Sequence, residues 1–183
     1  GGTVDATNVV ITGASDDSVD WTDGWTGSIQ RLLVIQADDA ADYAIEADNR
    51  STTAPDTLPR SNPTIANFTF VGNSEESAIR LREGTGATLV NGIVSGFARG
   101  LRFGDKATAD LLTAGPSAVD GVQTVIASHL FNNTEEVDAT EEGDPAAVTV
   151  TAAEIAAAPP LGASDWTVVF SVMSPVARST SSK

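Results

Sequence analysis

The feature that most constrains the fold is a short segment that recurs four times within the first hundred residues. Each copy has eight residues, three copies carry Asn at the third place, and three end in Gly. The copies begin at residues 6, 29, 65 and 89, which gives intervals of 23, 36 and 24 residues. Repeats of this length indicate a solenoid, in which each unit stacks on the next. The copies are ATNVVITG (6–13), IQRLLVIQ (29–36), IANFTFVG (65–72) and LVNGIVSG (89–96).

A second segment follows each copy and alternates apolar with charged residues. Such alternation predicts short strands with one buried face. The four segments are SVDW (18–21), AIEA (44–47), AIRL (78–81) and GLRF (100–103). Two inward rows are expected, Val19, Ile45, Ile79 and Leu101, then Trp21, Ala47, Leu81 and Phe103. The outward row is Asp20, Glu46, Arg80 and Arg102, in which Glu46 and Arg80 can form an ion pair between units.

The order of these segments predicts how the strands pair. No two-residue turn of the Asn-Gly kind separates them, and the same order recurs in every unit. Like strands therefore pair with like strands in parallel, and parallel connections are right-handed. The sequence predicts an all-β fold, a right-handed parallel β-helix of about four to five rungs. Its neighbouring columns should hold Val9 or Val10, Leu33, Phe68 or Phe70, and Ile93.

The longer interval contains a polar stretch rich in Pro, Ser and Thr. We interpret residues 51–62 as a loop inserted into a regular unit, which should protrude and be deleted at little cost in stability. We expect a single β-helix domain over 1–183, with regular rungs over 4–105. An irregular rung and a C-terminal cap should follow over 106–173, and a frayed tail over 174–183. The start within the repeat pattern favours a piece of a longer chain.

The C-terminal part is less regular than the first hundred residues. The stretch DKATADLLTAGPS (105–117) predicts a short helix, and DGVQTVIASHLFNNT (120–134) resembles one more rung. The acidic run over 133–145 is expected to be a solvated loop. A strand pattern and an Ala-rich helical pattern over 148–173 predict the cap, because an open solenoid end exposes strand edges.

These motifs resemble one known architecture. The Asn-led strand, the Gly corner and the rungs of about 23 residues are similar to the right-handed parallel β-helix of the pectate-lyase-like superfamily. The stretches DDSVDWTDGWTG (16–27) and LREGTG (81–86) resemble secreted bacterial β-helix surface proteins of unassigned activity. The resemblance implies the fold and an extracellular or cell-surface location. It implies no single activity, because this fold hosts lyases, hydrolases, adhesins and inert spikes.

The charge balance narrows the expected partners. The chain has 10 Lys and Arg against 25 Asp and Glu, a net charge of -15. Nucleic acid and anionic membrane are therefore not expected as partners, and a salt-adapted bacterial source fits the charge. No stretch approaches about 18 uncharged apolar residues, so no membrane span is expected. The chain has no cysteine, which excludes disulfides and thiolate metal sites.

Acidic pairs recur in the turns between the two segments. Rungs stack about 4.8 Å apart, so like charges in successive turns repel unless salt, a bound cation or a raised carboxyl pKa relieves them. Three interpretations stay open: a solvated acidic ridge, a Ca²⁺ site, which needs roughly six to eight oxygen ligands, and a pair of catalytic carboxylates. The candidate metal ligands are Asp16, Asp17, Asp38, Asp39, Glu75 and Glu76.

A ligand other than a metal would meet a different set of residues. Trp25 lies in the Gly-flanked corner DGWTG, and a flat indole ring can stack on a sugar with little loss of entropy. Asp20 and Asp23 flank this corner and could bind the hydroxyl groups of the same sugar. Trp21 is expected to belong to the core.

Three classes of function follow from these patterns. The first is an extracellular or cell-surface module with a structural or adhesive role and no catalytic residues. Its partner would be a polysaccharide or another surface protein, or a second copy joined end to end through an exposed terminal rung. The second class is a carbohydrate-binding module.

The third class is a polysaccharide lyase or glycoside hydrolase acting on acidic polysaccharide. The paired carboxylates resemble those of β-helix hydrolases, but the Gly-His-Gly and Arg-x-Lys elements that this resemblance implies are missing from the sequence. A lyase would need a basic residue as its catalytic base, for which Arg60, Arg80 or Arg82 could serve.

Overall fold

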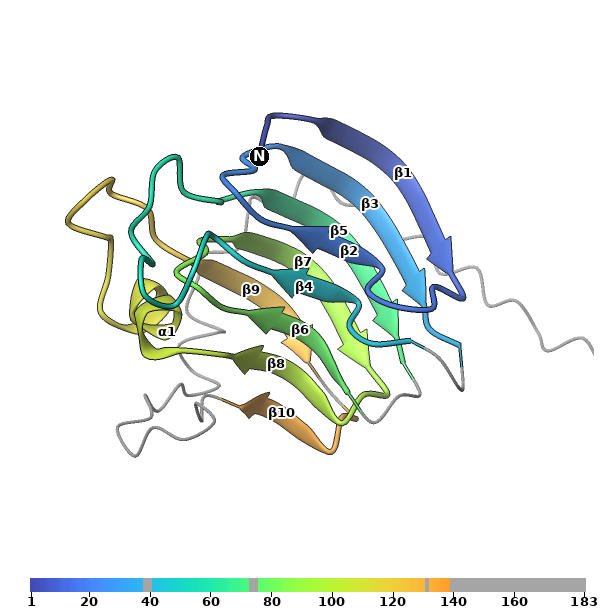
Figure 1. Cartoon of the computed structure of the whole chain (residues 1–183). Helices are drawn as coiled ribbons and strands as arrows, with labels where there is room; N and C mark the ends of the chain where they lie inside the picture. Colours follow the sequence, from blue (N-terminus) through green and yellow to red (C-terminus); the bar gives the residue numbers. More distant parts are fainter. Residues whose placement is uncertain (38–40, 73–75, 131, 139–183) are drawn as a thin grey trace, which may run out of the picture.

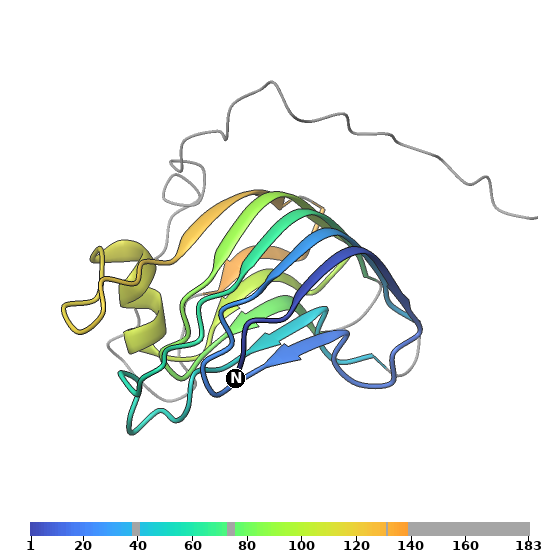
Figure 2. The same ribbon diagram turned by 90° about the horizontal axis from the view of Figure 1, so that it is seen from above.

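The described part of the chain forms two parallel five-stranded sheets that face each other across one core (Figures 1 and 2). The computed structural model describes residues 1–37, 41–72, 76–130 and 132–138. The first sheet has the order β1 (Asp5–Thr12), β3 (Ser28–Ile35), β5 (Thr64–Val71), β7 (Thr88–Ser95) and β9 (Val125–Leu130). The second has the order β2 (Val19–Trp21), β4 (Ile45–Ala47), β6 (Ser77–Leu81), β8 (Arg99–Phe103) and β10 (Glu135–Asp138).

The strand register is the one that the repeat predicts. Ala6 pairs with Ile29, Ile29 with Ile65, and Ile65 with Leu89, as the four aligned segments require. Within the described ranges, all strand pairs are parallel and α1 (Lys106–Thr113) is the one helix. The predicted all-β parallel β-helix is therefore confirmed. Val10, Leu33 and Ile93 share one row, next to the row of Val9, Leu32 and Phe68.

The recurring Asn has a structural cause. Asn8, Asn67 and Asn91, with Arg31 in the same row, adopt left-handed backbone conformations with φ between 53° and 61°. Asn tolerates this conformation better than most residues, because its short polar side chain can form local hydrogen bonds. The left-handed residue interrupts the in-out alternation of each long strand and helps to wrap the strand around the core. Asn91 Nδ2 donates to Asn67 Oδ1 at 2.6 Å, which links neighbouring rungs.

Inward rows of apolar side chains form the core. Phe68 and Phe70 are buried with ring centroids 4.7 Å apart. Gly92 follows Phe68 in the same row, and a Cβ at Gly92 would lie 2.0 Å from the Phe68 ring. The small residue is therefore what makes room for the large one in the rung below. The short strands contribute a second set of buried residues, Ile45, Ala47, Ile79, Leu81, Leu101 and Phe103.

One expectation for the C-terminal part is wrong. Residues 135–138 of the acidic run form β10, which pairs with β8, instead of a solvated loop. Asp138 is buried there because Arg99 and Arg102 of β8 compensate its charge, with Nε to Oδ2 distances of 3.1 and 3.6 Å. The helix expected within 105–117 is confirmed as α1, and the Asp105 side chain caps it by accepting from the Thr108 N–H at 2.9 Å.

The cap pattern over 148–173 and the tail over 174–183 lie outside the described residues. The inserted loop, by contrast, is described in full and is not free at its C-terminal end. Arg60 and Ser61 are buried, and the Arg60 guanidinium bonds Asp120 and the Gly84 carbonyl oxygen. This guanidinium therefore ties the loop to two later segments of the chain.

Candidate functional site

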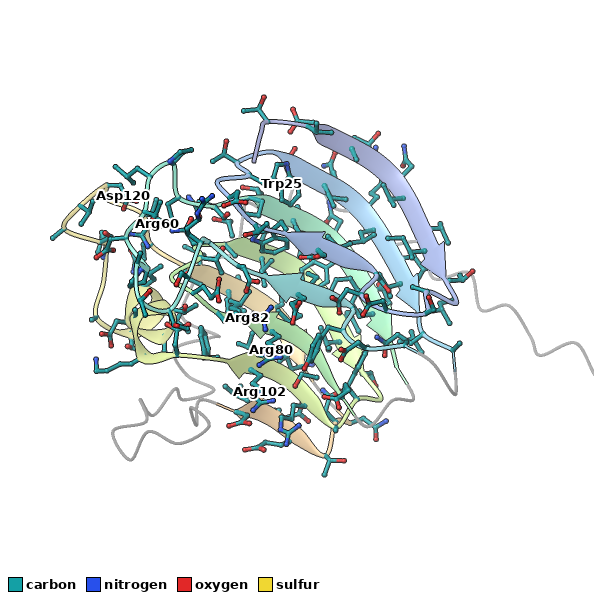
Figure 3. The ribbon with its side chains drawn as sticks, viewed as in Figure 1. Trp25, Arg60, Arg80, Arg82, Arg102 and Asp120 are labelled. Atoms are coloured by element: carbon teal, nitrogen blue, oxygen red, sulfur yellow. The ribbon has the colours of Figure 1, made fainter. Side chains whose placement is uncertain are left out.

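The outer face of the second sheet carries one continuous row of charged side chains. Strand pairing aligns Asp20 with Glu46, Glu46 with Arg80, and Arg80 with Arg102, so the four residues share one row as predicted. Asp20 is exposed and Glu46 and Arg80 are half-buried, whereas Arg102 is buried. Asp138 of β10 extends this row by one rung. In Figure 3 Arg80 lies on β6 and Arg102 on the neighbouring strand β8, and Arg82 directly follows β6.

Most of the charges on this face are paired with one another. Glu46 lies 3.5 Å from Arg80 and 3.0 Å from Arg82, and Arg82 also bonds Asp48 through Nε and Nη2 at 2.5 and 2.9 Å. Arg80 donates to the Tyr43 hydroxyl at 3.0 Å, and its guanidinium lies 5.3 Å from the centre of that ring. The predicted ion pair between Glu46 and Arg80 is present, but the shorter contact of Glu46 is with Arg82.

The carboxyl of Glu46 is a weaker acid than an ordinary glutamate. Burial raises the pKa of its carboxyl to about 7, and the charges of Asp17 and Asp48 act in the same direction. Arg82 and Arg80 oppose this shift without cancelling it. A carboxyl that gains and loses a proton near neutral pH can act as a general acid or base. The alternation of AIEA could place Glu46 on the outer face, but nothing in its neighbours along the chain indicates its burial.

Hydrogen bonds and neighbouring charges also shift the pKa of Arg82. Its hydrogen bonds with Asp48 and the nearby charge of Glu46 raise the guanidinium pKa, although burial opposes the rise. Arg82 therefore stays charged at every pH at which the protein is folded, which makes it unsuited to act as a catalytic base. Arg60, another candidate base, belongs to the inserted loop, bonds Asp120 and lies away from this face (Figure 3).

Among the described residues, the acidic turns bring together two predicted ligands, Asp16 and Asp17, and one residue that was not predicted, Asp42. Asp16, Asp17 and Asp42 each offer a carboxylate oxygen, and these oxygens lie within 4.8 Å of one another. Asp42 was not predicted, yet it stands three residues before Ile45, as Asp16 stands three before Val19. Alignment on the second strands places Asp42 opposite Asp16, whereas the predicted alignment of the turns placed Asp38 and Asp39 opposite Asp16 and Asp17. Residues 38, 39 and 75 lie outside the described ranges.

Burial and neighbouring charges raise the carboxyl pKa values of Asp17 and Asp42 in this cluster. Burial raises the pKa of Asp17 most, the Tyr43 N–H that bonds Asp17 Oδ1 at 2.9 Å lowers it, and Asp42 and Asp16 raise it further. Burial also raises the pKa of Asp42, followed by the charges of Glu76 and Asp16. Three carboxylates are hard oxygen donors of the kind that Ca²⁺ prefers, but they are fewer than the roughly six to eight ligands that it takes.

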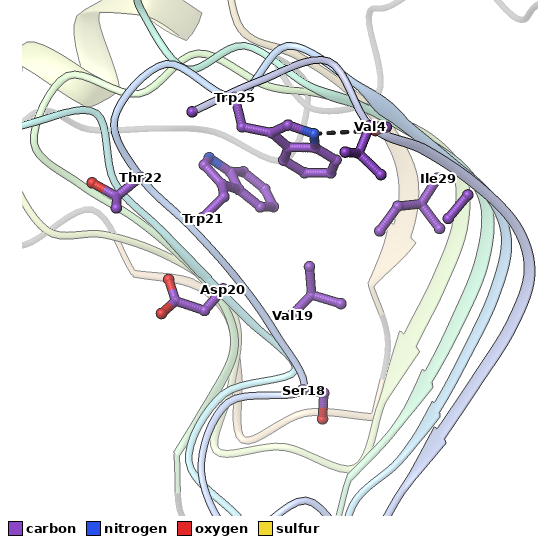
Figure 4. Close-up of a pocket in the computed structure, with 10 residues that line it drawn as sticks. Val4, Ser18, Val19, Asp20, Trp21, Thr22, Trp25 and Ile29 are labelled. Carbon is purple, nitrogen blue, oxygen red and sulfur yellow. Dashed lines mark hydrogen bonds between the residues drawn. The ribbon is translucent and has the colours of Figure 1, made fainter.

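The predicted sugar ligands divide between two places. Trp25 and Asp20 line a hollow of about 510 Å³ at the N-terminal end of the solenoid (Figure 4). Asp23 instead forms an ion pair with Arg50 beside a separate, smaller cavity. Trp21 is buried as predicted, with its ring centroid 5.5 Å from that of Trp25.

The stacked parallel rungs define a parallel β-helix protein. A family model described as "Pectate-lyase like beta helix domain" matches residues 1–169, and the chain belongs to this family. No curated protein and no solved structure matches the chain. Within the described residues, no helix is long and apolar enough to cross a membrane.

Proposed function

We propose that the chain is a non-catalytic β-helix module with a structural or adhesive role. The observation that supports this best is the mutual pairing of charges on the outer face of the second sheet. Glu46, Arg82 and Asp48 bond one another, and Asp138 is held by arginines of β8. Such pairing means that these side chains bond one another within the protein. It is typical of a stable surface more than of a reaction centre.

The proposal includes an extracellular or cell-surface location and a partner that is a polysaccharide or another surface protein. A net charge of -15 supports work in a salty medium, where ions screen self-repulsion. Ca²⁺ remains a candidate ligand of the cluster of Asp16, Asp17 and Asp42.

One observation favours a second candidate, an enzyme that acts on acidic polysaccharide. Glu46 has a pKa of about 7 and stands beside Arg80 and Arg82 on an outer face. A proton-exchanging carboxyl next to two guanidinium groups could bind an anionic sugar and move a proton. Carbohydrate binding without chemistry rests on Trp25, which is half-buried and donates its indole N–H to the Val4 carbonyl oxygen at 3.2 Å.

The deciding experiment is incubation with a panel of acidic and neutral polysaccharides, with and without Ca²⁺. New reducing ends report hydrolysis, and ultraviolet absorbance of unsaturated products reports lyase chemistry. We expect no turnover. Turnover that disappears in Glu46→Gln but persists in Asp110→Asn, an acid of the exposed Lys106 pair on α1, would promote the enzyme. Binding without turnover that is lost in Trp25→Ala would promote the carbohydrate-binding module.

A further inference from the structure

The outer face of the first sheet carries an apolar patch in which no side chain is charged. The patch consists of two adjacent outward rows that cross β1, β3, β5 and β7 (Figure 1). Val10, Ile35 and Val71 are 65%, 43% and 45% exposed, and Arg31 of the Asn row and His129 of β9 border the patch. The two rows are Val10, Leu33, Thr69 and Ile93, then Thr12, Ile35, Val71 and Ser95.

This patch differs from the rest of the described surface. Charged residues make up 19% of the chain, and every strand of the second sheet contributes one to its outer row. Contiguous exposed apolar side chains with polar ones around them mark a surface that something covers. The patch has eight residues, whereas a stable interface between two proteins takes about 20 to 30 residues a side. Its size therefore suits a single segment of chain better than a second folded protein.

The chain itself contains an apolar segment of suitable length and pattern. Residues 164–173 read SDWTVVFSVM, and the last eight of them carry no charge. Their alternation places Trp166, Val168, Phe170 and Val172 on one side of an extended segment. Eight extended residues measure about 26 Å, which is more than the roughly 14 Å across four parallel strands.

We propose that residues 164–173 pack as an extended segment across this patch, with their apolar side against Ile35 and Val71. The intervening chain is long enough to permit this. Residues 139–163 are 25 in number and can extend to about 80 Å. The distance to be crossed is three strand spacings, about 14 Å, and the separation of two packed sheets, about 10 Å. The proposal does not depend on whether the chain is catalytic.

The alternative place for this segment is the C-terminal end of the solenoid, where the sequence predicts a cap over 106–173. There β10 carries Glu135, which is exposed, and Glu136, which is half-buried. An uncharged strand added beside β10 would remove water from these carboxylates, and that removal costs free energy. The patch contains no ionisable group, so covering it carries no such cost.

The test is cross-linking within the full chain, which has no cysteine of its own. Val71→Cys with Val168→Cys should react with a short bismaleimide roughly tenfold or more faster than Lys106→Cys with Val168→Cys, because docking raises the effective concentration of the pair. Lys106 is the matched control, because its side chain is 51% exposed and it follows β8, the strand that pairs with β10. Labelling each single-cysteine variant with a monofunctional maleimide corrects for differences in reactivity.

A second substitution tests whether apolar contact holds the segment. Ile35→Glu, added to the Val71→Cys and Val168→Cys chain, should slow cross-linking to the rate of the control pair, because docking would then bury a carboxylate. Thr22→Glu introduces the same charge at an exposed position after β2, away from the patch, and should leave the rate unchanged.

Three outcomes would overturn the proposal. Equal rates for the Val71→Cys and Lys106→Cys pairs would show that the segment has no preference for the patch. Faster cross-linking of Val168→Cys to Glu135→Cys than to Val71→Cys would place the segment at the end of the solenoid. Cross-links that join two chains, with dimers seen by sedimentation of the wild type, would assign the patch to a second copy.

Discussion

Replacing Arg60 with alanine should destabilise the protein far more than replacing Arg50, although the two arginines stand only ten positions apart. The Arg60 side chain is 2% exposed and bonds Asp120 Oδ2 at 2.7 Å and the Gly84 carbonyl oxygen at 2.6 Å. The Arg50 side chain is 59% exposed and pairs with Asp23, which is 46% exposed. The two substitutions remove the same group from opposite environments.

The magnitude follows from what each substitution leaves behind. Without Arg60, the Asp120 carboxylate, 14% exposed, and the Gly84 carbonyl oxygen lose a charged partner. Removing one member of a buried ion pair costs about 3 to 5 kcal/mol, whereas exposed pairs contribute about 0 to 1 kcal/mol. In a domain of this size, the Arg60→Ala loss corresponds to a fall in Tm of roughly 6 to 20 °C.

Urea titration and thermal melting, followed by far-ultraviolet circular dichroism, measure both variants. Arg60→Lys should lie between Arg60→Ala and the wild type, because an ammonium group cannot reproduce the planar fork of a guanidinium. A pH series provides a second readout. Burial raises the pKa of Asp120, but hydrogen bonds from Arg60, the Val122 N–H and Ser117 lower it overall.

The sign of that pH effect is specific. A carboxyl with a lowered folded-state pKa adds stability above its usual pKa, and that stability is lost as the pH falls through the folded-state value. The difference between wild type and Arg60→Ala should therefore narrow on acidification. Equal stabilities of Arg60→Ala and Arg50→Ala at neutral pH would refute the argument from burial. Deleting residues 51–62 would also remove the Arg60 contacts with Asp120 and Gly84, so it should cost more stability than the deletion of a free loop.

Three further outcomes are expected. The contribution of Glu46 to stability should fall by about 3 kcal/mol as the pH rises from about 4.5 to about 7, because the folded state holds the Glu46 proton more tightly than the unfolded state. Melts across this range measure the contribution as the difference in slope between wild type and Glu46→Gln, and equal slopes would contradict the assignment. Gly92→Ala should lower the free energy of unfolding by about 1 to 3 kcal/mol, because its Cβ would overlap the Phe68 ring. Adding Phe68→Leu should recover part of this loss in urea titrations, and no recovery would contradict the packing argument. Tm should rise smoothly with NaCl, and Ca²⁺ should act only as a stronger screening ion. A saturable rise in Tm with Ca²⁺ at constant ionic strength that is lost in Asp17→Asn would show a Ca²⁺ site instead of a solvated acidic ridge.

The repeat in the sequence was sufficient to predict the strand register. Side chains alternate with period two along a strand, so a shift of one residue would exchange the buried and exposed faces. The apolar rows therefore permit one alignment, and Val19, Ile45 and Ile79 fall in one row as predicted. The Asn row was visible too, but its left-handed backbone became apparent only in the structure.

Corner geometry and burial depend on contacts between distant residues, which no local pattern specifies. Turns of unequal length separate the strands, so the alignment of the acidic residues depends on which strand it starts from, and the structure is what shows that Asp42 lies beside Asp16 and Asp17. The acidic run predicted a loop, because the sequence does not show that the arginines of β8 lie beside Asp138 and compensate its charge. The burial of Arg60 arises in the same way, because its partner Asp120 is sixty residues away in the chain and is brought beside it only by the stacking of rungs.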